Sequence, residues 1–388
     1  MISTLSAISQ IVLTQNLLSN LRNRVKLEKF HSLPNQTLEE LTLAIPARNE
    51  EKNLQILLTQ LVDQHSKPKE ILVLNDNSTD QTVEVVKSFE SRLPGIRILQ
   101  GEALPSGWRG KIWALNQLSR EALTPYILFI DADVRFTDSC SLASLWQAYS
   151  LRSKKGMASV FPKLRGTQGS AHLLLDQVYT QLYYFLPSVR YRKIFEGGLE
   201  NLIRLFPEAG FSSRIEGAVA ATGQVFLASK KDLESLNPWA RIRLTTHDGL
   251  KLARIFEKAG LDVHTFDGAQ VFECQMYKNF SEAFKGFSRN SFEALGESRA
   301  AVLFISGLLF WVFVMPYILW PFFLANPFWL VAFLYFLYGQ YQLASEMKLG
   351  MDHLALAPVK SASSVGVHLW GMVRSELGIK TLWKGREV

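Results

Sequence analysis

The chain has 388 residues, of which 48% are hydrophobic, so it is long enough to bury a substantial core. Its formal net charge is +7, but no recognisable nucleic-acid-binding module accompanies the basic residues, which argues against a nucleic-acid partner. The two cysteines, Cys140 and Cys274, lie far apart without CxxC spacing. This pattern suggests neither a disulfide framework nor a zinc site, and it fits a reducing cytosol.

Residues 1–38 are predicted to form an N-terminal lead. The segment has no positively charged region ahead of a long apolar core, so it does not resemble a signal peptide. Ile8, Ile11, Val12 and Leu18 recur at helical spacing. A helix of this kind either lies on a membrane surface or packs against the rest of the protein, and the pattern leaves both alternatives open.

Residues 39–275 are predicted to form an α/β domain in which strands and helices alternate. This order is typical of a mostly parallel, Rossmann-like sheet with right-handed crossovers. Apolar runs predict strands at 41–46, 71–74, 96–99, 126–130, 159–161 and 225–227. Apolar periodicity and capping residues predict helices near 54–62, over 78–89 after the polar cluster 77–80, from about 111, and over 248–259.

Asp131-Ala132-Asp133 follows the apolar run 126–130 and is the strongest chemical signal in the chain. Two acids separated by one residue can share Mg²⁺ or Mn²⁺ whose remaining ligands are phosphate oxygens and water. One Asp-X-Asp is expected by chance in a chain of this length, so the motif has weight only if its surroundings agree.

Polar residues also follow the first two predicted strands, and we expect them at the same edge of the sheet as Asp131. Lys111 follows two glycines at a helix start, where it can contact phosphate or ribose. Taken singly, these residues are also common in turns and helix caps. The expected nucleotide-sugar site comprises Pro46, Ala47, Arg48, Glu50, Asp76, Lys111 and Asp131, with Asp131 and Asp133 as metal ligands.

These motifs, in this order, resemble the family 2 glycosyltransferases of GT-A fold over roughly residues 40 to 270. The resemblance implies a UDP- or GDP-sugar donor, a Mg²⁺ or Mn²⁺ cofactor held at the Asp-X-Asp motif, and a later acid as base. Asp248, followed by a Leu-X-X-Arg-like helix, is the expected catalytic base of an inverting transfer. His247 stands where relatives commonly have an acid. It either assists proton transfer or caps the helix.

A long apolar segment follows this domain, without a charged residue between Arg299 and Glu346. It is about long enough for two membrane crossings of about 20 residues each, with Asn326-Pro327 as the turn. We therefore predict an interfacial connector at 276–299, a transmembrane hairpin at 300–345 and a basic tail at 346–388. Basic residues on both sides predict a multi-pass protein of the cell membrane with a cytoplasmic catalytic domain. A buried helix pair and re-entrant insertion remain alternatives.

The Gln-X-X-Arg-Trp motif of processive polysaccharide synthases is absent, and Arg289 lies in the corresponding segment. The chain resembles instead a membrane-anchored branch associated with hopanoids and with carotenoid glycosylation. This resemblance implies transfer of one sugar to a hydroxylated isoprenoid lipid. The expected acceptor pocket comprises Thr222, Gly223, Gln224, His247 and Arg289. The alternatives are transfer to polyprenyl phosphate, or a catalytically inactive membrane scaffold that keeps the GT-A shell.

Overall fold

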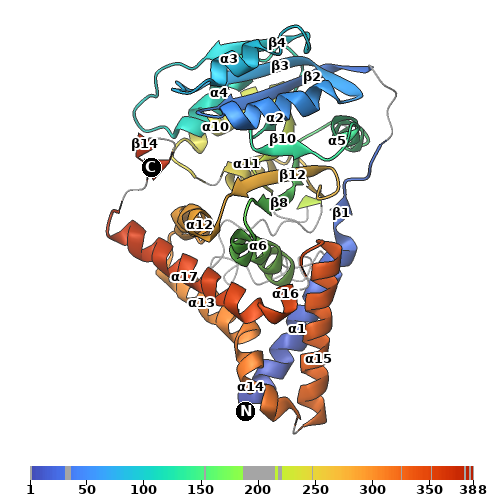
Figure 1. Ribbon diagram of the computed structural model, residues 1–388, viewed down its shortest axis with the longest axis vertical. Helices are drawn as coiled ribbons and strands as arrows, with labels where there is room; N and C mark the ends of the chain where they lie inside the picture. The colour runs from blue at the N-terminus through green and yellow to red at the C-terminus, as the bar shows by residue number, and fades with distance from the viewer. Residues whose placement is uncertain are drawn as a thin grey trace.

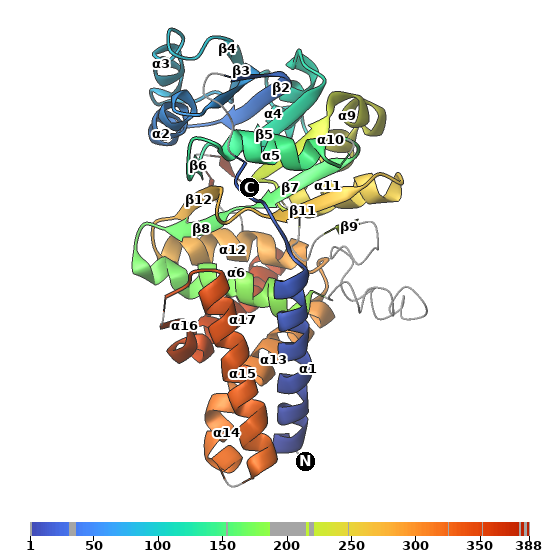
Figure 2. The same ribbon diagram turned by 90° about the vertical axis from the view of Figure 1, so that its right-hand side faces the viewer.

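The computed structural model has a body of sheets and helices above a stalk of long helices (Figures 1 and 2). The N-terminus lies at the far end of the stalk, and the catalytic motifs lie in the body. The structure describes residues 2–30, 36–152, 154–186, 215–216, 221–246, 248–324, 326–350, 352–379, 382–383 and 386–387.

A nine-stranded sheet forms the centre of the body, in the order β1-β11-β7-β10-β5-β2-β3-β4, with β9 beside β11. All paired strands are parallel except β10, which is antiparallel to β5 and β7. The predicted α/β fold with a mostly parallel sheet is therefore confirmed. The strands are β1 (Val25–Lys26), β2 (Gln36–Ala47), β3 (Ser66–Asn75), β4 (Ile96–Gln100), β5 (Tyr126–Ile130), β7 (Met157–Phe161), β9 (Ile215–Glu216), β10 (Val225–Ser229) and β11 (Val263–Asp267).

Alternate residues of the central strands face opposite sides of the sheet, and helices cover both sides. Leu43 and Ile45 belong to a buried core with α2 (Glu51–Val62), α3 (Thr82–Lys87) and α5 (Ser141–Ser150). Ala44, between them, belongs to a second core with α4 (Gly110–Glu121), α10 (Pro238–Arg241) and α11 (Asp248–Lys258). The short helix α9 (Lys230–Leu236) follows β10. Burial on both faces explains why these strands are continuous apolar runs in the sequence.

The helix predicted over 78–89 is shorter in the structure, because α3 spans only Thr82–Lys87. The polar cluster before it does not cap the helix, whose N-cap is Gln81 without a side-chain hydrogen bond. Instead Ser78 Oγ accepts from the Asn49 amide at 3.0 Å, and Asp80 Oδ2 accepts from the Glu51 amide at 3.1 Å. The cluster thus ties together the loops after β2 and β3.

A smaller sheet, in the order β6-β12-β8, connects the body to the helices below it. β12 (Phe272–Tyr277) is antiparallel to β6 (Val134–Phe136) and parallel to β8 (Lys163–Gly166). It leads directly into α12 (Phe280–Ala294). A residue pair near the C-terminus, β13 (Leu382–Trp383) and β14 (Arg386–Glu387), forms a third, two-stranded sheet.

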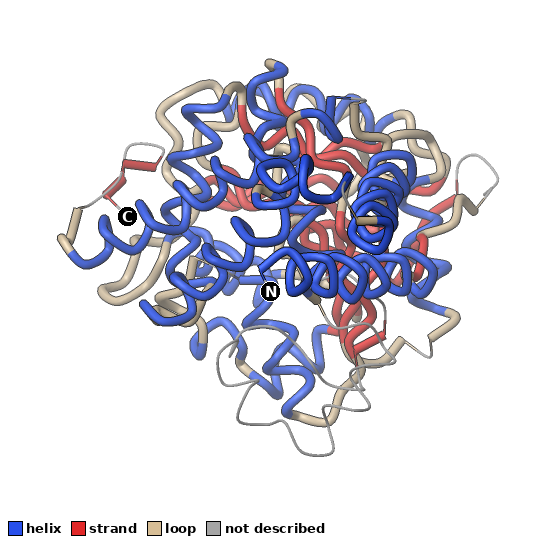
Figure 3. The backbone as a smooth tube through the Cα atoms, turned by 90° about the horizontal axis from the view of Figure 1, so that it is seen from below, coloured by secondary structure: helices blue, strands red, loops and turns tan. Residues whose placement is uncertain are grey.

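Helices from both ends of the chain form the stalk, and Figure 3 shows the N-terminus among them with the strands beyond. Its members are α1 (Ile2–Asn23), α13 (Arg299–Phe313), α14 (Met315–Leu324) and α15 (Pro327–Glu346). A turn lies at Asn326, as predicted, and the Asn326 side chain accepts from the Phe328 amide at 3.0 Å. Between stalk and body lie η1 (Gly169–Ala171), α6 (His172–Phe185), α12, α16 (Asp352–Ala355) and α17 (Ala357–Glu376).

The helix α1 is anchored to the rest of the protein rather than standing apart. Asn16 Nδ2 donates to the Tyr184 carbonyl at 2.8 Å, and Asn20 Nδ2 donates to the Tyr183 carbonyl at 2.8 Å. Within the described part of the chain, one stretch is long and apolar enough to cross a bilayer, Arg299–Pro321, with mean hydropathy 2.3. The second arm of the expected hairpin, α15, does not meet that criterion.

Candidate active site

Three side chains that the sequence singled out meet at the carboxyl edge of the central sheet. Asp131 follows β5, Lys111 lies in the first turn of α4, and Asp248 is the first residue of α11. Lys111 Nζ lies 2.8 Å from the Asp131 carboxylate and 2.9 Å from Asp248 Oδ2. One ammonium group therefore joins the acid of the Asp-X-Asp motif to the candidate base.

Two glycines allow the segment before β10 to lie directly against the start of α11. A Cβ atom at Gly223 would lie 1.9 Å from Asp248 Oδ1, and one at Gly249 would lie 2.3 Å from the Thr222 carbonyl carbon. The Asp131 amide donates to the Gln224 carbonyl at 2.9 Å. Thr222, Gly223 and Gln224, expected in the acceptor pocket, thus lie between Asp131 and Asp248.

The charges of this cluster are unevenly balanced. Burial raises the pKa of Asp131 to about 7; Lys111 opposes that rise, and the carboxylates of Asp133 and Asp248 add to it. Burial lowers the pKa of Lys111, but Asp131 and Asp248 raise it more, so it stays above its usual range. Lys111 is therefore a fixed cation in a group of three carboxylates.

The Asp-X-Asp motif fits a hard divalent cation by the chemistry of its donor atoms. Its two carboxylates are only partly buried and lie close enough to repel each other, which a cation would relieve. Across the described ranges, no group of three or more His, Cys, Asp or Glu side chains is arranged to hold a metal. A metal here would therefore take further ligands from a bound phosphate and water, as Mg²⁺ commonly does.

A buried thiol, which the sequence did not mark as functional, contacts this motif. Cys274 Sγ, on β12, lies 3.4 Å from Asp133 Oδ1, and Gln224 Nε2 lies 3.1 Å from the same sulfur. Burial raises the pKa of Cys274 well above its usual value, and the nearby Asp133 and Asp131 raise it further. The group is a neutral thiol that donates to Asp133 and limits where this carboxylate can turn.

The loops expected to hold the nucleoside are joined to each other by backbone hydrogen bonds. The Asp76 amide donates to the Ala47 carbonyl at 2.8 Å, and Arg48 Nη1 donates to the Asp76 carbonyl at 2.7 Å. Asn53 Nδ2 donates to Glu50 Oε2 at 2.8 Å. Pro46 ends this part of β2 opposite Leu74 of β3. The structure brings these residues to the same sheet edge as Asp131, with Arg48 bridging the two loops.

Arg289 lies apart from this cluster, on α12, beside Arg109 and Arg374 in a small pocket. His247 lies outside the residues that the structure describes. α12 nevertheless contacts the segment that leads into Asp248. Glu293 accepts from the Thr246 amide at 2.9 Å and from Lys251 Nζ at 2.6 Å. No motif marks Glu293 in the sequence, because its partners come from a different element and only the fold brings them together.

Known proteins with similar sequence or fold agree with these features. The profile of the Glycosyl transferase family 2 matches residues 42–164, which include β2 to β5 and the Asp-X-Asp motif. The 4,4'-diaponeurosporenoate glycosyltransferase of Staphylococcus aureus strain N315 is 26% identical over 292 residues, which cover 73% of this chain and 69% of the relative.

A solved structure supports the fold assignment. The mannosyltransferase PcManGT from Pyrobaculum calidifontis, in complex with GDP-Man and Mn²⁺, superposes with a TM-score of 0.51 at 15% identity, covering 98% of this chain and 100% of that one. At this identity the likeness concerns the fold, which is GT-A-like. The sheet, the Asp-X-Asp motif and the matching profile together identify the chain as a glycosyltransferase that contains a family 2 domain.

Proposed function

We propose that the protein transfers a single sugar from a nucleotide-sugar donor to the hydroxyl group of a membrane lipid, with inversion at the anomeric carbon and dependence on Mg²⁺ or Mn²⁺. The acceptor class is an isoprenoid such as a carotenoid or hopanoid. The bridge from Asp131 through Lys111 to Asp248 carries this proposal. It supports a site in which the donor phosphates and the acceptor hydroxyl approach each other at one sheet edge.

In this proposal the donor binds across the loops after β2, β3 and β5. Asp76 accepts from the nucleoside, and Arg48 and Glu50 keep the loop around it closed. Asp131 and Asp133 would hold the divalent ion, which, when bound, stabilises the negative charge of the departing diphosphate. Lys111 adds a second positive charge beside the phosphates and takes no part in proton transfer, since it remains protonated.

Asp248 takes the proton from the acceptor hydroxyl as the oxygen attacks the anomeric carbon. The acceptor lies on the Asp248 side and the diphosphate leaves on the Asp131 side. Attack from the face opposite the leaving group inverts the anomeric centre. Gly223 leaves no side chain between these two carboxylates, which keeps the space for the reacting atoms open.

The polarity of the stalk supports a membrane location. α1 turns its polar side chains inward, with Ser6, Gln10 and Thr14 all 0% exposed, while its apolar Leu5 and Val12 are each 52% exposed. This arrangement is the reverse of a helix in water and suits a lipid surrounding. On α13 to α15 the exposed large side chains are also apolar or aromatic: Leu303, Phe304, Phe310, Ile318, Trp320, Phe328, Val331, Leu334, Tyr338 and Tyr341.

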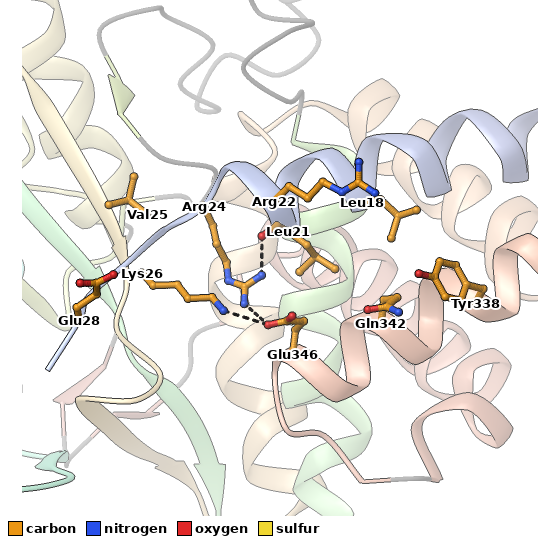
Figure 4. A pocket seen from close by; sticks show the side chains of 10 residues that line it. All are labelled: Leu18, Leu21, Arg22, Arg24, Val25, Lys26, Glu28, Tyr338, Gln342 and Glu346. Atoms are coloured by element: carbon orange, nitrogen blue, oxygen red, sulfur yellow. Dashed lines mark hydrogen bonds and ion pairs between the residues drawn. The ribbon is translucent and has the colours of Figure 1, made fainter.

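The stalk also has the length that a bilayer requires. α1 has 22 residues and α15 has 20, which correspond to helices of about 30 Å, near the thickness of the hydrocarbon layer. Charged residues begin only where the stalk joins the body. There Arg24 and Lys26 point toward Glu346 at the end of α15 (Figure 4). We infer that α1 enters the membrane together with α13, α14 and α15, and that the catalytic body faces the cytoplasm.

Nucleotide binding tests the proposed donor site directly. Calorimetry with UDP and with GDP, each with Mn²⁺, should detect binding to the full-length protein in detergent, and Asp131→Ala should abolish it. Asp63→Ala, which removes an exposed acid at the end of α2, is the matched control. Binding that survives Asp131→Ala would overturn the assignment of the metal site. Lipid extracts of cells with and without the protein would then identify the missing glycolipid.

Transfer to a polyprenyl phosphate is the second candidate, favoured by the arginines around Arg289. A phosphate acceptor is already anionic and needs no strong base. Asp248→Asn should therefore nearly abolish transfer to an alcohol and leave transfer to a phosphate largely intact. Retained glycosylation of an alcohol by this variant would contradict the role of Asp248.

A further inference from the structure

Arginines from three separate elements line one small pocket at the junction of body and helices. Arg109 precedes α4, Arg289 lies on α12, and Arg374 lies near the end of α17. The pocket has a volume of about 120 Å³ and is also lined by Thr246, two residues before Asp248. Its size admits a charged head group but not an isoprenoid tail.

Hydrogen bonds to main-chain carbonyls position these arginines. The Arg109 amide donates to the Arg243 carbonyl at 2.7 Å, and its Nε donates to the Leu244 carbonyl at 3.3 Å. Arg374 Nη2 donates to the Arg289 carbonyl at 3.1 Å. The guanidinium groups are therefore held near one another by the fold, and each is partly exposed at the pocket.

The positive charges are not balanced within the pocket. Burial lowers the pKa of Arg289, and the charges of Arg374 and Arg109 lower it further, against the opposing effect of Tyr277. Two acids also line the pocket. Glu293 already receives hydrogen bonds from Lys251, Thr245 and Thr246, and Glu297 is exposed to solvent. An oxyanion would relieve the repulsion among the arginines, because guanidinium groups pair strongly with carboxylate and phosphate.

The pocket lies between the candidate base and the start of the apolar segment. Thr246 leads to Asp248 on one side. On the other side Ser375, which lines the pocket, precedes Glu376, and Glu376 is paired with Arg299 at the first residue of the apolar stretch Arg299–Pro321. An amphiphile whose tail lies along that stretch has its head at this pocket, close to Asp248. The donor loops after β2 and β3 contribute no residue to it.

We propose that Arg109, Arg289 and Arg374 form a binding site for an oxyanion group, a carboxylate or a phosphate, on the lipid acceptor. This inference rests on the proposed function and narrows its acceptor to an amphiphile with an acidic head. The site positions the acceptor so that its nucleophilic oxygen faces Asp248. The same guanidinium chemistry would also suit the diphosphate of the donor, so the experiment must separate these two sources of oxyanion.

Octyl phosphate, octanoate and octanol serve as soluble probes with one tail and different heads, and calorimetry measures their binding to the full-length protein in neutral detergent. We expect octyl phosphate and octanoate to bind at least about tenfold more tightly than octanol, the scale of one charge-assisted hydrogen bond. Arg289→Gln and Arg374→Gln should each remove about this factor. Arg299→Gln, which removes a 73% exposed guanidinium from the same end of α17, is the matched control and should change binding less than about twofold.

The outcomes separate the inference from the proposed function. Binding of UDP and GDP with Mn²⁺ should be unchanged in the arginine variants, and its loss there would assign the pocket to the donor diphosphate and overturn the inference. Equal binding of octyl phosphate and octanol by the wild-type protein would overturn it as well, without requiring any variant to fold. Failure of the proposed function appears elsewhere, as absent nucleotide binding or as nucleotide binding that survives Asp131→Ala.

Discussion

Lys111 Nζ lies 2.9 Å from Asp248 Oδ2, and this ion pair connects two halves of the site that come from distant parts of the chain. The same ammonium holds the Asp131 carboxylate at 2.8 Å. Because one cation serves both acids, their separation is set by a single side chain. Changes at Lys111 should therefore affect donor binding and acceptor activation together.

Lys111→Met should lower the turnover number by about 100-fold or more, the scale reported for loss of one preorganised charge in an active site. It leaves Asp131 and Asp248 to repel each other. Steady-state kinetics with the sugar donor measures the change, and Lys87→Met, an exposed residue at the end of α3, is the control. Wild-type turnover in Lys111→Met would contradict the bridging role.

Gly223→Ala should displace Asp248 and lower turnover by about tenfold or more, because its Cβ would lie 1.9 Å from Asp248 Oδ1. Gly169→Ala is matched to it, since a Cβ at Gly169 meets nothing within 4 Å. Comparing turnover with the thermal midpoint of unfolding distinguishes a displaced carboxylate from general instability. Equal effects of the two substitutions would argue against close contact at Gly223.

Removal of divalent ions with EDTA should abolish nucleotide binding, and Mn²⁺ or Mg²⁺ should restore it. Asp133→Asn should raise the concentration of Mn²⁺ needed for restoration by about tenfold or more, since it removes one anionic ligand. Asp63→Asn should restore like the wild type. Metal-independent binding of the nucleotide would rule out the role given to the Asp-X-Asp motif.

The contact between α12 and the segment before Asp248 should depend on acid pH. Burial raises the pKa of Glu293, but hydrogen bonds from Lys251, Thr245 and Thr246 lower it more, to about 2 from 4.5. A carboxyl group whose pKa is lowered by folding contributes stability above its unfolded pKa and loses it as the pH falls through the folded value. The difference in thermal midpoint between wild type and Glu293→Gln should therefore shrink as the pH falls from about 4.5 to about 2.

Glu297→Gln is the control for that measurement, because Glu297 is exposed on the neighbouring turn. It should show no comparable change across the same pH interval. A constant difference between wild type and Glu293→Gln would mean that the Glu293 carboxylate does not hold the segment in solution.

The outward-facing apolar side of α1 should be needed for membrane attachment. Ile8→Lys with Val12→Lys places two charges on the exposed side of that helix, each costing about 2.5–3.5 kcal/mol in the centre of a bilayer. The double variant should be released from membranes by alkaline carbonate, while Leu123→Lys, at a site 78% exposed on the catalytic body, should stay bound. Full retention of the double variant would place α1 outside the lipid.

The fold of the catalytic body was predictable because its signals are local. Apolar runs marked β2, β3, β4, β5, β7 and β10, and the polar residues after them marked the active edge, since parallel strands place their carboxyl ends together. The prediction of a helix over 78–89 was wrong for a related reason. A cluster such as Ser78 and Asp80 has the composition of a helix cap, but here it binds a neighbouring loop that the local sequence does not reveal.

The sequence by itself determined the class of enzyme and the acids that belong to its site, because motif spacing along parallel strands dictates which residues share an edge. Only the tertiary structure decided that Lys111 joins Asp131 to Asp248, that Cys274 contacts Asp133, and that Arg109 and Arg374 join Arg289 in one pocket. These contacts link segments that are far apart in the chain. Their distances depend on how whole helices and sheets pack, which no local pattern of residues encodes.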